Sequence, residues 1–313
     1  MIPFSITFRI RALFLKAMKH FLNLIDMSAT ELERLLDLSL SLKRTKDSPK
    51  PLEGKYLAMI FEKPSTRTRI SFEAGMNQLG GKASFLSVND LQLGRGETIE
   101  DTAKVISSMA DGIVLRTTSH KKLVSFAKNS TVPVINGLTD LSHPCQLLAD
   151  LLTYFELKGS ILDAKVTWVG DYNNVCYSYV EASKLFNFHL DIACPKDFWP
   201  EENIRKESGA NFTEDLKSAV QGSDLVCTDV WISMGDEEDS SQRFDIFSNY
   251  QVSPKLMDFA KQDAIFLHCL PAVRGQEVSE EMLDDPRSKV WIQAENRLHA
   301  QKALLIELLN SDN

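Results

Sequence analysis

The 313-residue chain lacks the features that mark several classes of protein. It has no apolar run of roughly 18–20 residues, so no segment is predicted to span a membrane. Acidic residues outnumber basic ones by 43 to 35, and the net charge of −8 argues against a surface that binds nucleic acid or an anionic membrane. The patterns G-x-x-x-x-G-K-[ST] and G-x-G-x-x-G are both missing, so neither a P-loop nor a nicotinamide cofactor is predicted.

Cysteine is scarce, with five residues in the chain. The number is odd, the spacing is wide and no C-x-x-C occurs, which favours a reducing cytoplasm over a disulfide framework. Cys145 and Cys269 lie close in sequence to His143 and His268, but the spacings match no zinc-ligand pattern. We therefore interpret the cysteines mainly as packing residues and predict no metal site.

Residues 1–17, MIPFSITFRIRALFLKA, are apolar and basic without an acidic residue. Arg9 and Arg11 interrupt the apolar run, and no small-residue cleavage site follows. The segment is therefore interpreted as an N-terminal extension, with the folded chain beginning at about Met18.

The rest of the chain alternates between predicted strands and helices. This pattern predicts an α/β fold with two doubly wound parallel-sheet domains joined by long helices. Helix boundaries are marked by a capping box that begins at Ser28, and by Pro144 and Gly159 around a long central helix. The predicted domains are 18–150, 151–292 and a C-terminal helix, 293–313, that packs back on the first domain. Strands are predicted at 55–61, 83–88, 112–116, 133–136, 165–170, 190–194, 224–230, 264–269 and 289–292.

Parallel α/β sheets bind ligands at the carboxyl ends of their strands, so polar residues at those positions are candidates for a site. The motif STRTR, residues 65–69, follows the first predicted strand and opens a helix. A helix N-terminus has unpaired N–H groups and partial positive charge. Three hydroxyls and an arginine fork added there predict a phosphate site. A plain helix cap explains any one of these residues but not the whole group.

Other strand ends in the first half carry Arg116, His143 and Gln146, which suit an anion with a polarisable carbonyl group. The second half offers an amide and the carboxylate of Asp229, which suit an ammonium-bearing, amino-acid-like molecule. The amide comes from Asn173 or Asn174, and the sequence leaves this choice open. Two facing half-sites of this kind predict that a phosphorylated electrophile meets an amine.

Four motifs, STRTR, HPCQLLAD, DVWISMG and HCLPA, occur in this order and resemble the aspartate/ornithine carbamoyltransferase family. The first two are shared by both branches, and the last two resemble the ornithine branch. The resemblance extends from about Met18 to Leu309. It implies transfer of a carbamoyl group from carbamoyl phosphate to the δ-amino group of L-ornithine, giving L-citrulline and phosphate. It also implies a trimer, or a multiple of trimers, and no cofactor.

Matching the motifs residue by residue implies the following roles. The catalytic residues would be Arg67, Thr68, Arg116, His143 and Cys269. Carbamoyl phosphate would contact Ser65, Thr66, Arg67, Thr68, Gln92, Arg116, His143, Pro144, Cys145, Gln146, Cys269, Leu270 and Arg297. In this family the residue matching Gln92 acts in the site of a neighbouring chain. Ornithine would contact Asn174, Asp229, Ser233 and Met234.

Two alternatives remain at this stage. One is a sister transferase that uses another amine, such as aspartate or putrescine. An aspartate enzyme is expected to need extra cationic groups for a second carboxylate, and the WISMG segment supplies none. The other is a non-catalytic anion-binding protein of the same fold, against which the presence of both half-sites argues.

Overall fold

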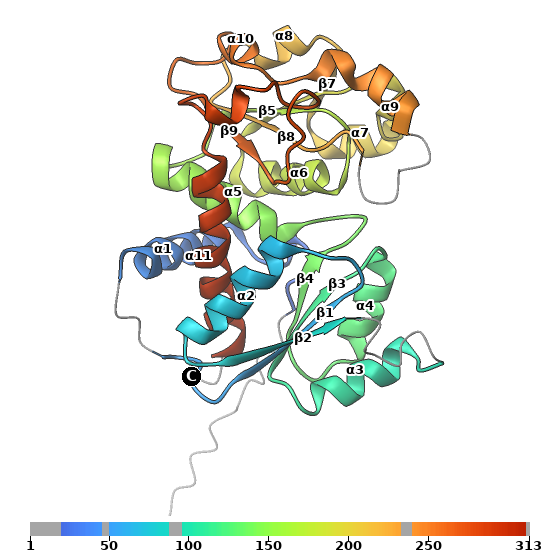
Figure 1. Ribbon diagram of the computed structural model, residues 1–313, viewed down its shortest axis with the longest axis vertical. Coiled ribbons are helices and arrows are strands. Elements are labelled where there is room, and N and C mark those ends of the chain that lie inside the picture. Colours follow the sequence, from blue (N-terminus) through green and yellow to red (C-terminus); the bar gives the residue numbers. More distant parts are fainter. Residues whose placement is uncertain (1–19, 46–49, 88–95, 233–239, 311–313) are drawn as a thin grey trace, which may run out of the picture.

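The computed structural model describes residues 20–45, 50–87, 96–232 and 240–310. The N-terminal extension therefore lies outside the described residues. Two parallel sheets form the centres of two lobes, which Figure 1 shows one above the other. The first sheet has the order β2-β1-β3-β4 and consists of β1 (Tyr56–Phe61), β2 (Lys82–Ser87), β3 (Gly112–Arg116) and β4 (Val134–Leu138).

The second sheet has the order β7-β6-β5-β8-β9, and its strands are also parallel. Its strands are β5 (Lys165–Val169), β6 (His189–Ala193), β7 (Asn211–Thr213), β8 (Leu225–Thr228) and β9 (Ile265–His268). Eight strands of the two sheets coincide with predicted segments to within two residues at most boundaries. The three-residue strand β7 escaped prediction because it is too short to show an alternation.

Eleven α-helices are present among the described residues. Those of the first half are α1 (Ala29–Arg44), α2 (Thr66–Gln78), α3 (Ile99–Ser107), α4 (His120–Asn129) and α5 (Pro144–Lys158). The second half contributes α6 (Asn174–Phe186), α7 (Glu202–Ser208), α8 (Leu216–Val220), α9 (Ser240–Phe247), α10 (Pro254–Met257) and α11 (Val290–Leu309). The predicted capping box at Ser28 is confirmed, as are Pro144 at the first turn of α5 and Gly159 at its C-cap.

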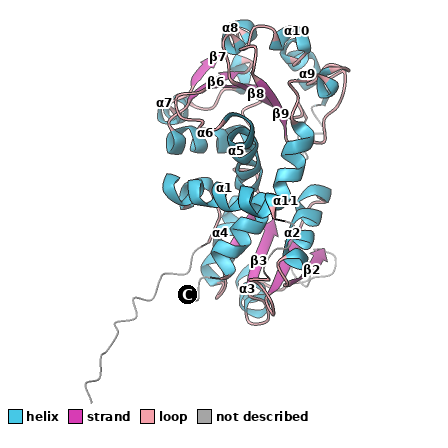
Figure 2. Cartoon of the chain, turned by 90° about the vertical axis from the view of Figure 1, so that its left-hand side faces the viewer, coloured by secondary structure: helices cyan, strands magenta, loops and turns pink. Residues whose placement is uncertain are grey.

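Helices cover both faces of each sheet, as the prediction of doubly wound domains requires. One face of the first sheet packs on α3 and α4 through Ala103, Leu123 and Phe126. Its other face packs on α1, α2, α5 and α11. This core continues into the second lobe through α6, so a single apolar cluster joins the two lobes. Figure 2 shows α1, α5 and α11 close together between the sheets.

The last helix, α11, begins within the second lobe and runs down to the first (Figure 1). It packs against α5, α1 and α2, and Leu309 reaches the backbone of Gly112 in β3. The predicted strand at 289–292 is wrong, because Val290 to Ile292 form the first turn of this helix. A short apolar run does not distinguish a strand from the start of a buried helix.

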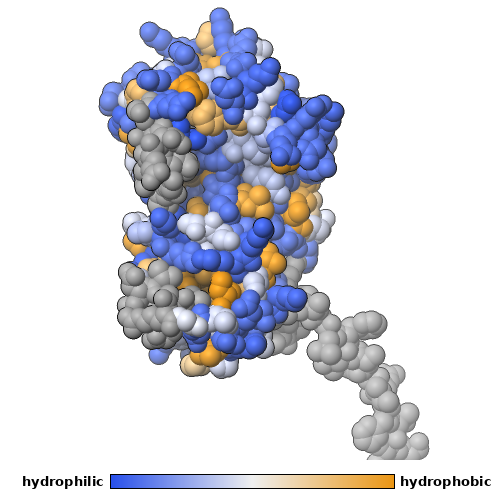
Figure 3. Space-filling view, turned by 90° about the vertical axis from the view of Figure 1, so that its right-hand side faces the viewer, coloured by the Kyte–Doolittle hydropathy of each residue, from blue (hydrophilic) through white to orange (hydrophobic). Residues whose placement is uncertain are grey.

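The order of strands reverses between β1 and β3 in the first sheet and between β5 and β8 in the second. At such a reversal the helices leave to opposite faces, and a crevice opens beyond the carboxyl ends of the strands. Among the predicted site residues, Ser65 to Thr68, Arg116, Asn174 and Asp229 lie at or just beyond the ends of these four strands, whereas His143, Gln146 and Cys269 follow β4 and β9 and Arg297 lies in α11. No described helix combines the length and apolar character needed to cross a membrane. On the face shown in Figure 3, hydrophilic residues predominate and hydrophobic residues form separate small patches.

Candidate active site

The STRTR turn links β1 to α2. Ser65 is the N-cap of α2, and its hydroxyl accepts a hydrogen bond from the Thr68 N–H at 3.3 Å. Thr68 is buried and Arg67 is half-buried, whereas Arg69 is exposed and pairs with Glu73 at 3.1 Å. The turn therefore directs Arg67 inward and Arg69 outward, so only the first of its two arginines belongs to the site.

Three arginines converge beside this turn from distant parts of the chain. Arg116 ends β3, and Arg297 lies in α11, where it donates to the Thr68 hydroxyl at 3.1 Å and to the Gln146 side-chain oxygen at 2.6 Å. Burial, followed by repulsion from Arg297 and Arg67, lowers the pKa of Arg116 to about 10. Within the described part of the chain, Arg67, Arg116 and Arg297 form no ion pair with a carboxylate. Arg116 and Arg297 are buried and Arg67 is half-buried, and mutually repelling cations of this kind are typical of an anion site.

His143 and Gln146 border the same cluster, at the N-terminus of α5. The backbone N–H of His143 donates to the Ser178 hydroxyl at 2.8 Å. Burial lowers the pKa of His143 well below its usual value, and the three arginines lower it further. His143 is therefore neutral at neutral pH. Cys145 packs in the core, where burial raises the pKa of its thiol to about 12 and its Sγ donates to the Asn136 carbonyl.

The second half-site lies at the carboxyl ends of β5, β8 and β9. Asp229 accepts hydrogen bonds from the Asn173 amide at 2.8 Å and from the Cys269 thiol at 2.9 Å. The Asn174 amide instead donates to the Thr139 carbonyl of the first lobe at 2.6 Å. Asn173 also caps α6, so its side chain is already committed to Asp229 and to the helix. The two half-sites lie next to each other. Burial lowers the pKa of Arg67, and Cys269 and Asp229 of the second half-site lie close enough to oppose that lowering.

A buried histidine and glutamate shape the HCLPA turn after β9. The His268 Nδ1 accepts from the Leu270 N–H at 2.9 Å, which leaves Nε2 to donate to the Glu277 carboxylate at 3.1 Å. Leu270 has a φ of 57°, and the Leu270–Pro271 peptide bond is cis. The turn brings Cys269 to Asp229.

Asp229, His268 and Cys269 are the one group of described residues whose ligand atoms lie close enough together to hold a metal ion. Both imidazole nitrogens of His268 already have partners within the protein. Burial, followed by the neighbouring Asp229, raises the pKa of the Cys269 thiol well above its usual value. A protonated thiol and an occupied imidazole fit hydrogen bonding better than metal coordination.

Most of the predicted site residues lie together at these two strand reversals. Gln92, Ser233 and Met234 lie outside the described residues, and Pro144 occupies the first turn of α5, where it has neither a polar side chain nor an N–H group. Prediction from sequence missed a cluster of buried polar side chains behind the site, formed by Asp150, Tyr179 and Gln293. One signal was available, because Asp150 is a charged residue within the apolar run of the central helix.

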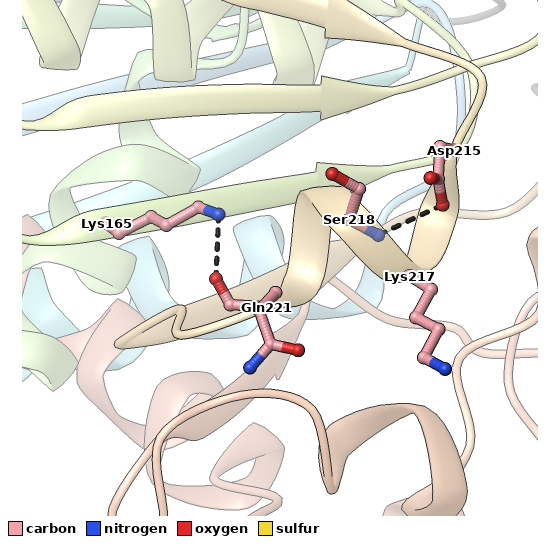
Figure 4. A pocket seen from close by; sticks show the side chains of 5 residues that line it. All are labelled: Lys165, Asp215, Lys217, Ser218 and Gln221. Atoms are coloured by element: carbon pink, nitrogen blue, oxygen red, sulfur yellow. Dashed lines mark hydrogen bonds between the residues drawn. The ribbon is translucent and has the colours of Figure 1, made fainter.

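A surface hollow of about 420 Å³ lies elsewhere, near the amino end of β5. Figure 4 shows its lining, in which Lys165 donates to the Gln221 carbonyl at 2.8 Å and Asp215 caps Ser218 at 3.0 Å. These polar groups pair with one another at the edge of the sheet opposite the arginines. The hollow therefore does not belong to the candidate active site.

Two family models match the chain. The one described as "Aspartate/ornithine carbamoyltransferase, carbamoyl-P binding domain" matches residues 19–156, and the one described as "Aspartate/ornithine carbamoyltransferase, Asp/Orn binding domain" matches residues 162–308.

Relatives of known name match along most of their length. An ornithine carbamoyltransferase of Psychrobacter cryohalolentis is 53% identical over 298 residues, which cover 94% of this chain and 98% of the relative. A Pseudomonas aeruginosa protein named "Ornithine carbamoyltransferase, anabolic" is 52% identical, covering 94% and 97% of the two chains. The structure of ornithine carbamoyltransferase from Pyrococcus furiosus aligns with a TM-score of 0.89 and 46% identity, covering 94% of this chain and 98% of that one.

Proposed function

Because the chain belongs to the aspartate/ornithine carbamoyltransferase family, we propose that it transfers the carbamoyl group of carbamoyl phosphate to the δ-amino group of L-ornithine. The products are L-citrulline and phosphate. One observation carries this function at the level of the site. Arg67, Arg116 and Arg297 converge without a carboxylate partner among the described residues, directly beside the hydrogen-bonded pair of Asp229 and Cys269. An anion and an amine are thereby bound side by side.

The first half-site binds carbamoyl phosphate. Ser65, Thr66, Arg67 and Thr68 hold the phosphate through hydroxyls, the guanidinium and the N-terminal N–H groups of α2. Arg116 bridges the phosphate and the carbonyl oxygen. It remains cationic at neutral pH, because its pKa is lowered only to about 10. The remaining contacts to this substrate are His143, Pro144, Cys145, Gln146, Cys269, Leu270 and Arg297, with Gln92 from a neighbouring chain.

The second half-site binds ornithine through Asn174, Asp229, Ser233 and Met234. The δ-amino group must lose its proton before it attacks, because a free alkylammonium has a pKa of about 10.4. A site crowded with guanidinium groups lowers that pKa. Cys269 lies beside Asp229 as a neutral thiol, so it acts as a polar contact for the amine and not as a nucleophile.

Attack on the carbonyl carbon forms a tetrahedral oxyanion. Thr68, Arg116 and His143 are the donors aimed at this oxygen, and the Arg67 guanidinium stabilises the departing phosphate. His143 is neutral, so it contributes a hydrogen bond and no net positive charge. Bringing the two substrates together in one site supplies a further share of the rate enhancement.

Several coarser features accompany this function. Residues 18–150 take carbamoyl phosphate and residues 151–292 take ornithine, while 293–313 return to the first domain. A homotrimer is the active unit, as the resemblance of the motifs implies. The described cysteines are all free, which supports a reducing compartment such as the cytoplasm. The relative named anabolic supports a role in arginine biosynthesis.

The proposed function is tested by citrulline formation from carbamoyl phosphate, with ornithine, aspartate and putrescine supplied in parallel. Ornithine is expected to be the preferred acceptor by at least about 10³-fold, since the other acceptors leave buried polar groups unpaired. Faster turnover with putrescine or aspartate would establish the sister-transferase alternative. Absence of turnover with all three, in a protein that binds phosphate, would establish the anion-binding alternative.

The phosphate site is tested with a matched pair of variants from the same motif. Arg67→Ala is expected to lower kcat/KM by roughly 10²–10³-fold, as for loss of one strong donor to the transition state. Arg69→Ala removes a neighbouring arginine that is exposed and bound to Glu73, and it is expected to stay within about threefold of the unmodified protein. An equal loss of kcat/KM in both variants would contradict the conclusion that Arg67 points into the site and Arg69 points away from it.

A further inference from the structure

The cluster of buried polar side chains behind the candidate site is centred on Asp150, which is 3% exposed. Its Oδ1 accepts from the Gln146 amide at 2.8 Å and from the Gln293 amide at 2.6 Å. Its Oδ2 accepts from the Tyr179 hydroxyl at 2.7 Å. The donors come from α5, α11 and α6, so one carboxylate binds three helices. The space beside it has no room for a water molecule, and the carboxylate depends on these protein donors.

The contact between Asp150 and Gln146 fixes the orientation of an amide. The Gln146 oxygen faces Arg297 Nη1 at 2.6 Å, and its nitrogen faces Asp150. A carboxylate only accepts hydrogen bonds and a guanidinium only donates them. Turning the amide over would set oxygen against oxygen and nitrogen against nitrogen, and both polar atoms would lose their partners in a buried place. Gln146 therefore presents an acceptor, and never a donor, on the side of the arginines.

We propose that Asp150 is a positioning residue that makes the site selective for the amino group of carbamoyl phosphate, by holding the Gln146 oxygen toward it. This inference rests on the proposed function, in which Gln146 contacts the carbamoyl group. An amide oxygen has two lone pairs. One accepts from Arg297, and no other described residue donates to this oxygen, so the second lone pair can accept from the substrate N–H. A phosphorylated compound with a methyl group in place of the amino group gains nothing from this acceptor.

The same carboxylate supports the other half-site. Gln293 donates to Asp150 through its nitrogen, and its oxygen accepts from the His268 N–H at 3.0 Å. His268 begins the turn that carries Cys269 toward Asp229. Asp150 thus binds two amides, that of Gln146 beside the carbamoyl phosphate site and that of Gln293 behind the turn that carries Cys269.

Two variants of Asp150 distinguish the effect of where its Oδ1 lies from the effect of the negative charge of its carboxylate. Asp150→Asn removes the charge and keeps a carbonyl oxygen for both glutamine amides, while its new NH₂ group faces the Tyr179 hydroxyl, which can accept as well as donate. Asp150→Glu keeps the charge and moves the oxygens by one methylene group. Tyr179→Phe serves as the control, because it removes only the donor on Oδ2.

The measurement is calorimetric binding of three stable probes: phosphonoacetamide, which retains the amino group, acetonylphosphonate, which has a methyl group instead, and inorganic phosphate. Asp150→Glu is expected to lose about tenfold in affinity for phosphonoacetamide, the equivalent of one hydrogen bond, and less than about threefold for the other two. Asp150→Asn and Tyr179→Phe are expected to stay within about threefold for all three probes. If Asp150→Glu fails to fold, Asp150→Ser replaces it with the same expectation, because its hydroxyl is too short to reach both amides.

Two outcomes would overturn the inference. Equal loss for all three probes would mean that Asp150 only maintains the packing of the site. A loss in Asp150→Asn as large as that in Asp150→Glu would mean that an oxygen held in place without the negative charge is not sufficient. Citrulline formation by the unmodified protein is measured separately, so failure of the proposed function is distinguishable from failure of this inference.

Discussion

Glu181 provides a pH dependence of stability that can be worked out from its surroundings. It lies in α6 and is 3% exposed. One carboxylate oxygen accepts from the Leu24 N–H at 3.1 Å, and the other has no hydrogen-bond partner among the described residues. The pKa of Glu181 is raised to about 7, chiefly by burial and also by Asp26, while the Leu24 N–H and Lys184 oppose the shift. The short helix η1 (Leu24–Asp26) thus packs against α6 beside the Glu181 carboxyl group, whose surroundings favour its protonated form.

The magnitude follows from the difference between the folded and unfolded pKa values. A rise from 4.5 to about 7 corresponds to about 3 kcal/mol, at about 1.36 kcal/mol for each unit. Because the folded state holds its proton more tightly, the contribution to stability is complete below pH 4.5 and is lost as the pH rises through about 7. Most of this loss, about 2–3 kcal/mol, falls between about pH 5 and about pH 8.5.

The perturbation is Glu181→Gln, which keeps an oxygen for the Leu24 N–H and cannot ionise. Urea unfolding at fixed protein concentration is measured at about pH 5 and about pH 8.5 for both proteins. The variant is expected to gain about 2–3 kcal/mol relative to the unmodified chain between these two conditions. Other titrating groups are common to both proteins and cancel in the difference. Parallel pH profiles, within about 0.5 kcal/mol, would refute this account of the Glu181 environment.

Three further predictions test other parts of the structure. The pKa of His143 is lowered well below 6.5, so its ring signals in NMR spectra should not titrate between about pH 6 and about pH 8; a titration near 6.5 would contradict the burial argument. Gly112→Ala should destabilise the fold by about 1–3 kcal/mol in urea unfolding, since its Cβ would come within 2.6 Å of Leu309, and Leu309→Ala in the same chain should recover part of the loss. Glu277→Ala should cost about 2–4 kcal/mol by leaving His268 without its acceptor, whereas Glu277→Gln, which keeps an acceptor oxygen, should cost less than about 1 kcal/mol in the same assay; equal costs would show that the charge of Glu277 matters more than its oxygen.

The comparison of sequence and structure shows which features have local causes. Ser28, Pro144 and Gly159 mark helix ends through interactions within one turn, and all three were predicted correctly. The segment 289–292 failed, because a three-residue apolar run is equally compatible with a strand and with the first turn of a buried helix. Contacts that α11 makes with distant helices decide this case, and they are invisible in a short window of sequence.

The pattern of residues along the chain accounts for the alternation of strands and helices, and with it the edge of each sheet where polar residues gather. It also determined the anion-binding turn, because hydroxyls, an arginine and a helix N-terminus lie within five residues. The tertiary structure alone decided that Arg67 turns inward and Arg69 outward, and that Asp150 binds the amides of Gln146 and Gln293. The physical reason is that capping and turns depend on neighbours along the chain, whereas the partner of a buried charge is chosen by the packing of helices that are far apart in sequence.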